Sequence, residues 1–304
     1  MTGVRKYADL TCTEFNKINT HKAICLMTVS PLEVHGPHLP LGTDVYIGEK
    51  LQQEYCKALL QRYPDFELLL LPPLFAGCDS LPVKGSITIR AKTLESFLLD
   101  MAGQLSKMGF KYLVICDNHG GPSHQIAMEV ASRKAWHCYN FYLINPFNVI
   151  YRMMVRHDKK FLQMINLASG NCGDDADAHA GTNETSLMLA TNPELVRDYL
   201  NVSSSFLARK KGLSAAVGWL GKIFNKMGLV NISADLEHLA NLVNWTRDAK
   251  NQPYLGSPSK ANADDGERMT KGHVSIAVDL IEKSISGQRP FTKPMLWWLR
   301  LFRR

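Results

Sequence analysis

The stretch that decides the fold is Ala23-Ile-Cys-Leu-Met-Thr-Val-Ser-Pro-Leu-Glu-Val-His-Gly-Pro-His-Leu-Pro-Leu-Gly-Thr-Asp44. Its first eight residues form an apolar, β-prone run that is typical of a buried strand. The fourteen residues 31–44 then hold a carboxylate, two imidazoles and a second carboxylate, which is the make-up of a metal site. Glu33 and His35 are expected at the carboxyl end of the strand, where the active sites of open α/β sheets collect. Because they are two residues apart in extended chain, both side chains can reach one ion.

Asp44 closes this stretch, after Gly36, Pro37 and Pro40 have ended the regular structure. A helix is expected to run from about Asp44 to about Tyr63. Asp44 therefore has two alternative roles, that of a metal ligand and that of a helix N-cap, and it could serve as both.

Further apolar runs repeat the rhythm of strand, helix and strand. Strands are expected at 66–71, 111–116 and 141–144, and helices at 93–107 and 123–136. A short strand is also expected at 86–89, inside a loop excursion. This alternation predicts a layered α/β fold, with a mostly parallel sheet covered by helices on both faces. We expect one domain that spans residues 1–304.

Two segments fall outside this rhythm. Residues 202–252 carry Arg209-Lys-Lys211 and apolar residues at helical spacing, which predicts an inserted helical pair that serves as a cover or a subunit contact. The tail 288–304 is basic and aromatic. It could lie on an anionic membrane, but so short a segment binds weakly and an oligomer contact is at least as plausible.

Composition excludes several classes of protein. The net charge is +7, yet Lys and Arg are not gathered into an Arg-rich or aromatic-interleaved patch, so nucleic acid is not an expected partner. No apolar run is long enough to span a membrane, and the N-terminus lacks the apolar core of a signal peptide. The seven cysteines form no Cys-x-x-Cys pair and are expected to be reduced. A cytoplasmic protein is expected, with membrane contact unlikely.

Two more clusters carry histidine and carboxylate. Asp117-Asn-His-Gly-Gly121 follows a predicted strand, and its His119 is well placed for a metal, although taken alone it would more often be structural. Asp174-Asp-Ala-Asp-Ala-His-Ala-Gly-Thr-Asn-Glu-Thr-Ser186 precedes an apolar helix. A helix-start box with Thr182 as the cap would explain part of that cluster but not His179.

Together the three clusters predict a hydrolytic centre with one or two divalent ions. Nitrogen and oxygen ligands without thiolate suit Zn, Mn or Fe(II), and Asp44 could bridge a pair of ions. Such a pair polarises a carbonyl and supplies hydroxide near neutral pH, which amide hydrolysis requires.

The order and spacing of the motifs resemble those of the creatininase (creatinine amidohydrolase) family. The matching motifs are Glu33-x-His35-Gly-Pro-His-Leu-Pro-x-x-Thr43-Asp44, Asn118-His119-Gly-Gly, His179-Ala-Gly-x-x-Glu184-Thr-Ser, and Gly256-Ser-Pro-Ser-Lys-Ala261 with Gly266-Glu267. The resemblance implies a layered α/β fold, hydrolysis of cyclic or linear amides, and a homo-oligomer, often a hexamer. It implies as metal ligands Glu33, His35, Asp44 and His119.

Two positions depart from the creatininase pattern. Gly121 and Ala178 stand where creatininases have a metal-binding and a catalytic Glu, so a branch that does not act on creatinine is expected. In relatives with Gly-Gly in the second motif, Glu184 could complete the metal shell.

The resulting prediction is a metal-dependent amidohydrolase that acts on a carbon–nitrogen bond, other than a peptide bond, in a small metabolite. His179 would carry the proton to the leaving nitrogen, steadied by Asp177 or Asp175. The alternatives are maturation of a short precursor peptide and a non-catalytic scaffold. The substrate pocket is expected to be shaped by 78–84, 147–172 and the insertion.

Overall fold

A computed structural model describes residues 3–167, 177–207, 209–247 and 252–302 of the chain. Its centre is a parallel sheet with the strand order β1-β3-β2-β5-β6, and β4 pairs with the carboxyl end of β2. The strands are β1 (Val4–Lys6), β2 (Ala23–Ser30), β3 (Glu67–Leu70), β4 (Leu74–Phe75), β5 (Tyr112–Cys116) and β6 (Tyr142–Ile144). The expected parallel sheet is confirmed, and β2 lies buried at its middle.

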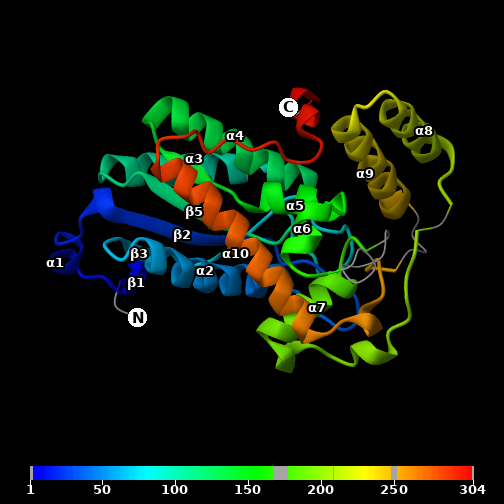
Figure 1. Cartoon of the computed structure of the whole chain (residues 1–304), viewed down its shortest axis with the longest axis horizontal. Coiled ribbons are helices and arrows are strands. Elements are labelled where there is room, and N and C mark those ends of the chain that lie inside the picture. The colour runs from blue at the N-terminus through cyan, green and yellow to red at the C-terminus, as the bar shows by residue number, and fades with distance from the viewer. Residues whose placement is uncertain (1–2, 168–176, 208, 248–251, 303–304) are drawn as a thin grey trace.

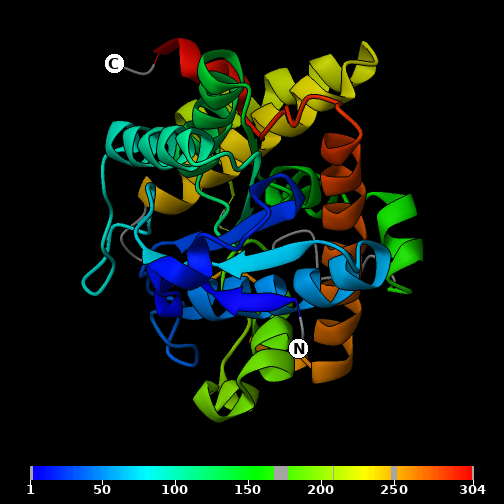
Figure 2. The same ribbon diagram turned by 90° about the vertical axis from the view of Figure 1, so that its left-hand side faces the viewer.

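Helices cover both faces of this sheet (Figures 1 and 2). Along β2, Cys25 and Met27 face the helices α3 and α4, whereas Ile24 and Leu26 face α2 and α10. Because both sides of β2, β5 and β6 are buried, these central strands are made almost entirely of apolar residues, whereas the edge strand β1 is partly exposed and carries Arg5 and Lys6. The helices of this layer structure are α2 (Thr43–Arg62), α3 (Ala91–Lys107), α4 (Pro122–Tyr139), α5 (Phe147–Val155), α6 (Lys159–Met164), α7 (Thr182–Thr191) and α10 (Ala263–Ile285).

Three expectations about local structure are wrong. Residues 86–89 form no strand, since Ile87 makes only an isolated bridge to Leu32 and is 56% exposed, without a neighbouring strand to extend the pairing. Asp44 is not the N-cap of α2, because the cap position is Gly42 and Asp44 lies in the first turn. Likewise Gly181, not Thr182, is the N-cap of α7; the Thr182 hydroxyl instead donates to the Ser257 carbonyl at 3.0 Å.

The described helices of the insertion and the tail residues 288–302 lie at one side of this layered structure. Helices α8 (Gly212–Lys226) and α9 (Val230–Arg247) pack on each other as a hairpin. The C-terminal stretch crosses α4 and ends in the 3-10 helix η6 (Trp297–Phe302), which Figure 1 shows near α9. Cys12, Cys25, Cys56, Cys116 and Cys138 are free thiols. No helix among the described residues is long and apolar enough to cross a membrane.

Candidate metal centre

Six side chains with nitrogen or oxygen ligand atoms meet at the carboxyl ends of β2 and β5. Their backbone positions follow from the topology: the loops after β2 and β5 and the N-terminal turns of α2 and α7 all open at this edge of the sheet. Three groups have ligand atoms that all lie within 4.8 Å of one another, namely Glu33–His35–His179, Glu33–Asp44–His119 and His35–Asp44–Glu184. The sequence predicted every one of these residues as a site residue, and the fold brings them together.

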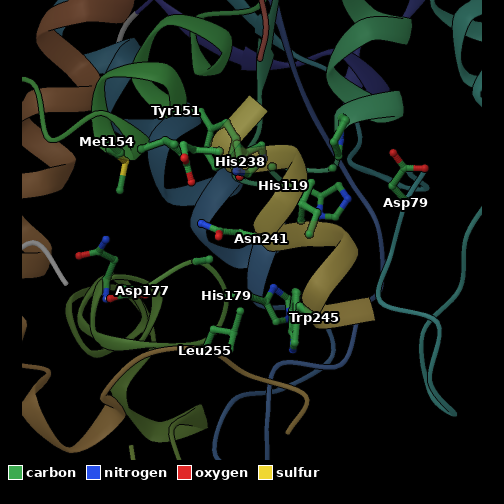
Figure 3. Close-up of a pocket in the computed structure, with 18 of the residues that line it drawn as sticks. Asp79, His119, Tyr151, Met154, Asp177, His179, His238, Asn241, Trp245 and Leu255 are labelled. Carbon is green, nitrogen blue, oxygen red and sulfur yellow. The ribbon is translucent and has the colours of Figure 1, made fainter. Parts of the chain in front are cut away.

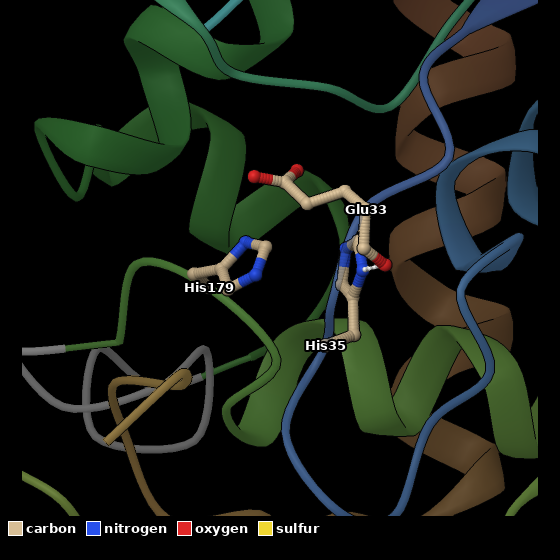
Figure 4. A group of neighbouring side chains, drawn as sticks. All are labelled: Glu33, His35 and His179. Atoms are coloured by element: carbon tan, nitrogen blue, oxygen red, sulfur yellow. Dashed lines mark hydrogen bonds between the residues drawn. The ribbon is translucent and has the colours of Figure 1, made fainter. Parts of the chain in front are cut away.

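The three histidines share one hydrogen-bonding arrangement. In each ring one nitrogen donates to a backbone carbonyl: His35 Nδ1 to Glu33 at 3.0 Å, His119 Nε2 to Cys78 at 2.8 Å, and His179 Nε2 to Val34 at 2.7 Å. Figure 4 shows the bond from His35 to the Glu33 carbonyl, with the His179 ring beside these two residues. Since a carbonyl only accepts, the other ring nitrogen is the one that can face a cation, which is the arrangement typical of metal-binding histidines.

The carboxylates supply the facing oxygen atoms. Asp44 Oδ1 lies 3.5 Å from Nε2 of His35, and Asp44 Oδ2 lies 3.4 Å from Nδ1 of His119. Glu33 Oε2 lies 3.0 Å from the same His119 nitrogen. Glu33 Oε2, His35 Nε2 and Asp44 Oδ2 are buried and have no hydrogen-bond partner. Buried polar atoms rarely stay unpaired, so the residues present fit a bound cation.

The electrostatics of the centre also favour a cation. Burial alone would lower the pKa of His35, but the carboxylates of Asp44 and Glu184 outweigh it and raise that pKa to about 10. Burial opposes ionisation of Glu33 too, yet the neighbouring His119 and His179 lower its pKa to about 2. The pKa of Asp44 is likewise held well below its usual value by His35 and His119, against the effect of burial. A proton and a metal ion therefore compete for the same histidine nitrogens.

Comparison with known proteins follows from this geometry. The family model for creatininase, described as creatinine amidohydrolase, matches residues 8–281. The chain belongs to the creatininase family. The resemblance stated from the motifs is thus confirmed, and the chain is a creatininase-family hydrolase.

The relatives of this creatininase-family chain carry two different names. It is 27% identical over 274 residues to a mycofactocin precursor peptide peptidase of Mycolicibacterium smegmatis, covering 85% of this chain and 84% of that one. It is also 27% identical over 201 residues to a creatinine amidohydrolase of Pseudomonas putida, covering 62% and 72% of the two chains. A crystal structure of a putative creatinine amidohydrolase from Bacteroides fragilis shares the fold, with a TM-score of 0.63, 21% identity and coverage of 95% and 99%. Two further creatininase structures of this fold are described as an Mn form and a Zn–Zn type.

Glu184 points into the centre. Its Oε2 lies 3.6 Å from Nε2 of His35 and accepts a hydrogen bond from the backbone N–H of Ala180 at 2.6 Å. The amide nitrogen of Asn118 donates to Glu184 Oε1 at 3.1 Å and to Asp44 Oδ1 at 3.3 Å. Asn118 thus fixes two carboxylates at once, a role that the sequence analysis missed although the residue lies in its second motif.

The two positions that depart from the creatininase pattern have a structural account. A Cβ atom at Gly121 would lie 2.7 Å from the Cys78 carbonyl oxygen and would clash with the His119 ring. Position 121 therefore cannot carry a Glu without moving His119. Ala178 lines the cavity beside His179 and presents only a methyl group there.

His179 stands at the rim of the centre, with Nδ1 3.9 Å from Glu184 Oε2. The side chain of Asp177 accepts a hydrogen bond from the backbone N–H of Asn183 at 2.8 Å and so anchors the first turn of α7. Asp177 belongs to none of the three ligand groups found among the described residues, and its role beside His179 stays a prediction. Asp175, the alternative partner, lies outside the described residues.

A cavity of about 440 Å³ opens from the metal centre. Its walls come from the three segments that the sequence analysis expected, including α5 and, from the insertion, α9. Figure 3 shows Asn241 and Trp245 of α9 beside His119 and His179. The Trp245 and His179 rings are 5.4 Å apart between centroids. Trp245 could not be identified from the sequence, because only the packing of the insertion decides which face of α9 meets the cavity.

Proposed function

We propose that this creatininase-family hydrolase is a metal-dependent amidohydrolase that cleaves a carbon–nitrogen bond in a small metabolite. The observation that carries the proposal is the set of unpartnered buried atoms of Glu33, His35 and Asp44, which face one another beside histidines fixed by backbone carbonyls. Structural histidines and carboxylates at such depth normally pair with each other or with the backbone.

Two overlapping groups of ligands support a pair of ions. Glu33, Asp44 and His119 would hold one ion, and His35, Asp44 and Glu184 would hold the other, with Asp44 shared between them. Nitrogen and oxygen ligands suit Zn, Mn or Fe, and the manganese and zinc forms of other creatininases agree with that choice. When bound, such ions polarise a carbonyl group and lower the pKa of water to near neutrality.

The chain's own residues then bind and protonate the substrate. His179 belongs to the third ligand group, with Glu33 and His35, but it also lines the cavity. We assign it to proton delivery to a leaving nitrogen rather than to an ion. The contact of its Nε2 with the Val34 carbonyl fixes the ring so that Nδ1 is the atom that exchanges the proton. Trp245 covers this ring and shields it from water.

The test is a metal-loaded enzyme assayed on a panel of lactams, formamides and short peptides. We expect turnover of at least one amide, and loss of both metal and turnover in His35→Ala and His119→Ala. An exposed histidine replaced in the same way, His21→Ala, is the control and should keep both. If the two site variants kept wild-type metal content and turnover, the assignment would be wrong.

A second candidate, cleavage of a peptide bond in a short precursor, is favoured by two observations. The relative that covers 85% of the chain is named a precursor peptide peptidase. The cavity of about 440 Å³ is within the range of sites that hold ligands far larger than a simple lactam. Turnover of peptides but not of lactams or formamides would favour this candidate, and metal binding without any turnover would favour a scaffold. A homo-oligomer, with a hexamer as the expected form, stays a prediction for sedimentation analysis.

A further inference from the structure

Two segments outside the metal centre hold the positive charge of the chain. The stretches 209–232 and 288–304 carry ten of the 35 Lys and Arg residues and none of the 28 Asp and Glu residues. The remainder of the chain therefore has 25 basic and 28 acidic residues. The basic residues are therefore denser in these two segments than in the rest of the chain.

The first of these segments also exposes apolar side chains. Trp219 of α8 is 62% exposed, and its neighbour Leu220 is exposed as well. The turn from α8 to α9 continues this character with large exposed side chains at Met227, Leu229, Val230 and Ile232. Lys222 and Lys226 are exposed on the same helix. Apolar residues bordered by lysines, without carboxylates, are typical of helices that lie in a lipid interface.

The second segment is held beside α9, the helix that follows the first segment, by Arg152 of α5. Its guanidinium forms an ion pair with Asp235 of α9 at 3.0 Å and donates to the Pro294 carbonyl at 2.8 Å. The tail ends in η6, where Leu301 is 73% exposed and the Arg300 guanidinium stacks on Trp297. In both views the C-terminal helix and the α8–α9 hairpin lie at the same side of the molecule (Figures 1 and 2).

We propose that α8, the turn into α9, and η6 form one docking surface for an anionic lipid bilayer. Charge complementarity carries the choice of partner, because Lys222, Lys226 and Arg300 lie exposed on this surface. The surface carries no Asp or Glu, and the longer stretches 209–232 and 288–304 that contain it have ten basic and no acidic residues. The exposed tryptophan and leucine side chains enter the headgroup region, and the lysines and arginines bind the lipid phosphates. The contact is peripheral, since no described helix can span a bilayer. Two basic apolar segments acting together overcome the weak binding expected of the tail alone.

The test is flotation of the full-length protein with lipid vesicles. It should float with vesicles of phosphatidylcholine mixed with phosphatidylglycerol, should stay behind with phosphatidylcholine alone, and should detach at high salt. The double variant Lys222→Glu/Lys226→Glu should lower partitioning at least about tenfold, since each basic residue near the surface contributes roughly 1 kcal/mol. Trp219→Ser should weaken binding as well, whereas Leu200→Ser, an equally exposed leucine outside both segments, should not.

Thermal unfolding, which should match that of the wild-type protein, serves as the check that each variant is folded. Failure of the wild-type protein to float with the anionic vesicles, equal flotation with neutral vesicles, or undiminished flotation of the double variant would each overturn the proposal. A non-floating wild type whose oligomer dissociates in Trp219→Ser would show instead that a second copy of the chain covers this surface. None of these outcomes depends on the proposed amidohydrolase activity.

Discussion

Asp44 and His119 face each other across 3.4 Å, from Oδ2 to Nδ1, yet Asp44 Oδ2 has no hydrogen-bond partner. The other ring nitrogen of His119 is occupied by the Cys78 carbonyl, so the ring cannot turn away from the carboxylate without losing that contact. A cation between the two atoms satisfies both.

Asn118→Ala should weaken metal binding roughly 10- to 100-fold, as is usual when the residue that orients a ligand is lost. The amide of Asn118 bridges Asp44 and Glu184, and without it these carboxylates lose a common donor. Competition with a chelator measures the affinity. Asn201→Ala, which removes a similar amide bound only to Asp198 on the surface, is the matched control and should leave the affinity unchanged.

Gly121→Ala should lower metal affinity and destabilise the fold by about 1–3 kcal/mol. The added Cβ would press on His119 and on the Cys78 carbonyl, which together set the direction of the ligand nitrogen. Thermal unfolding with and without metal checks both effects. Gly218→Ala in α8, whose Cβ would meet nothing closer than 3.5 Å, should be neutral or stabilising. If Gly121→Ala were as stable as the wild-type protein, position 121 would not lie as close to His119 and the Cys78 carbonyl as the structure shows.

How much of this could be foreseen differs between the fold and the site. The run 23–30 predicted the bounds of β2 correctly, since a strand buried on both faces is nearly continuous in apolar residues and Pro31 follows it directly. The run at 86–89 misled because β-branched residues favour extended chain even where no partner strand lies alongside.

The ligand residues could be predicted because Glu, His and Asp have side chains that bind metals, and these residue types stand at predicted strand ends. Asn118, Trp245 and the carbonyls behind the histidines were not, since hydrogen-bond partners distant in sequence depend on packing. The role of Gly121 likewise emerges only when the Cys78 loop is placed beside it.

Trp245→Ala should lower kcat/KM roughly five- to tenfold on whichever amide or peptide is turned over, with metal content unchanged. The ring contacts His179 in the cavity wall, and an aromatic contact of this kind contributes roughly 1 kcal/mol. Steady-state kinetics with metal analysis measures both quantities. Trp219→Ala, on the other helix of the hairpin and outside the cavity, should keep wild-type kinetics. Equal losses in both variants would point to a general effect on the hairpin.

His273→Leu should make the free energy of unfolding depend less steeply on pH below about 6.5. His273 of α10 is fully buried with neither ring nitrogen hydrogen-bonded, and burial lowers its pKa from 6.5 to about 4. The folded state therefore favours the neutral ring. The contribution of the neutral His273 ring to the free energy of unfolding is complete above about pH 6.5. It is lost as the pH falls through about 4, which lowers the free energy of unfolding by on the order of 3 kcal/mol.

Urea unfolding between pH 4 and 7 measures this slope. The exposed His21→Leu is the control and should keep the wild-type slope. An unchanged slope in His273→Leu would mean that its ring is not held neutral in the folded protein.

The central claim is that two groups of ligands share Asp44, and the number of ions bound per chain tests it most directly. After equilibration with Zn²⁺, Mn²⁺ or Fe²⁺ and removal of free metal, elemental analysis should find two ions per chain, and at most one in Asp44→Asn. A wild-type chain that retains none of these ions, or an Asp44→Asn variant that retains the full wild-type content, would contradict the account.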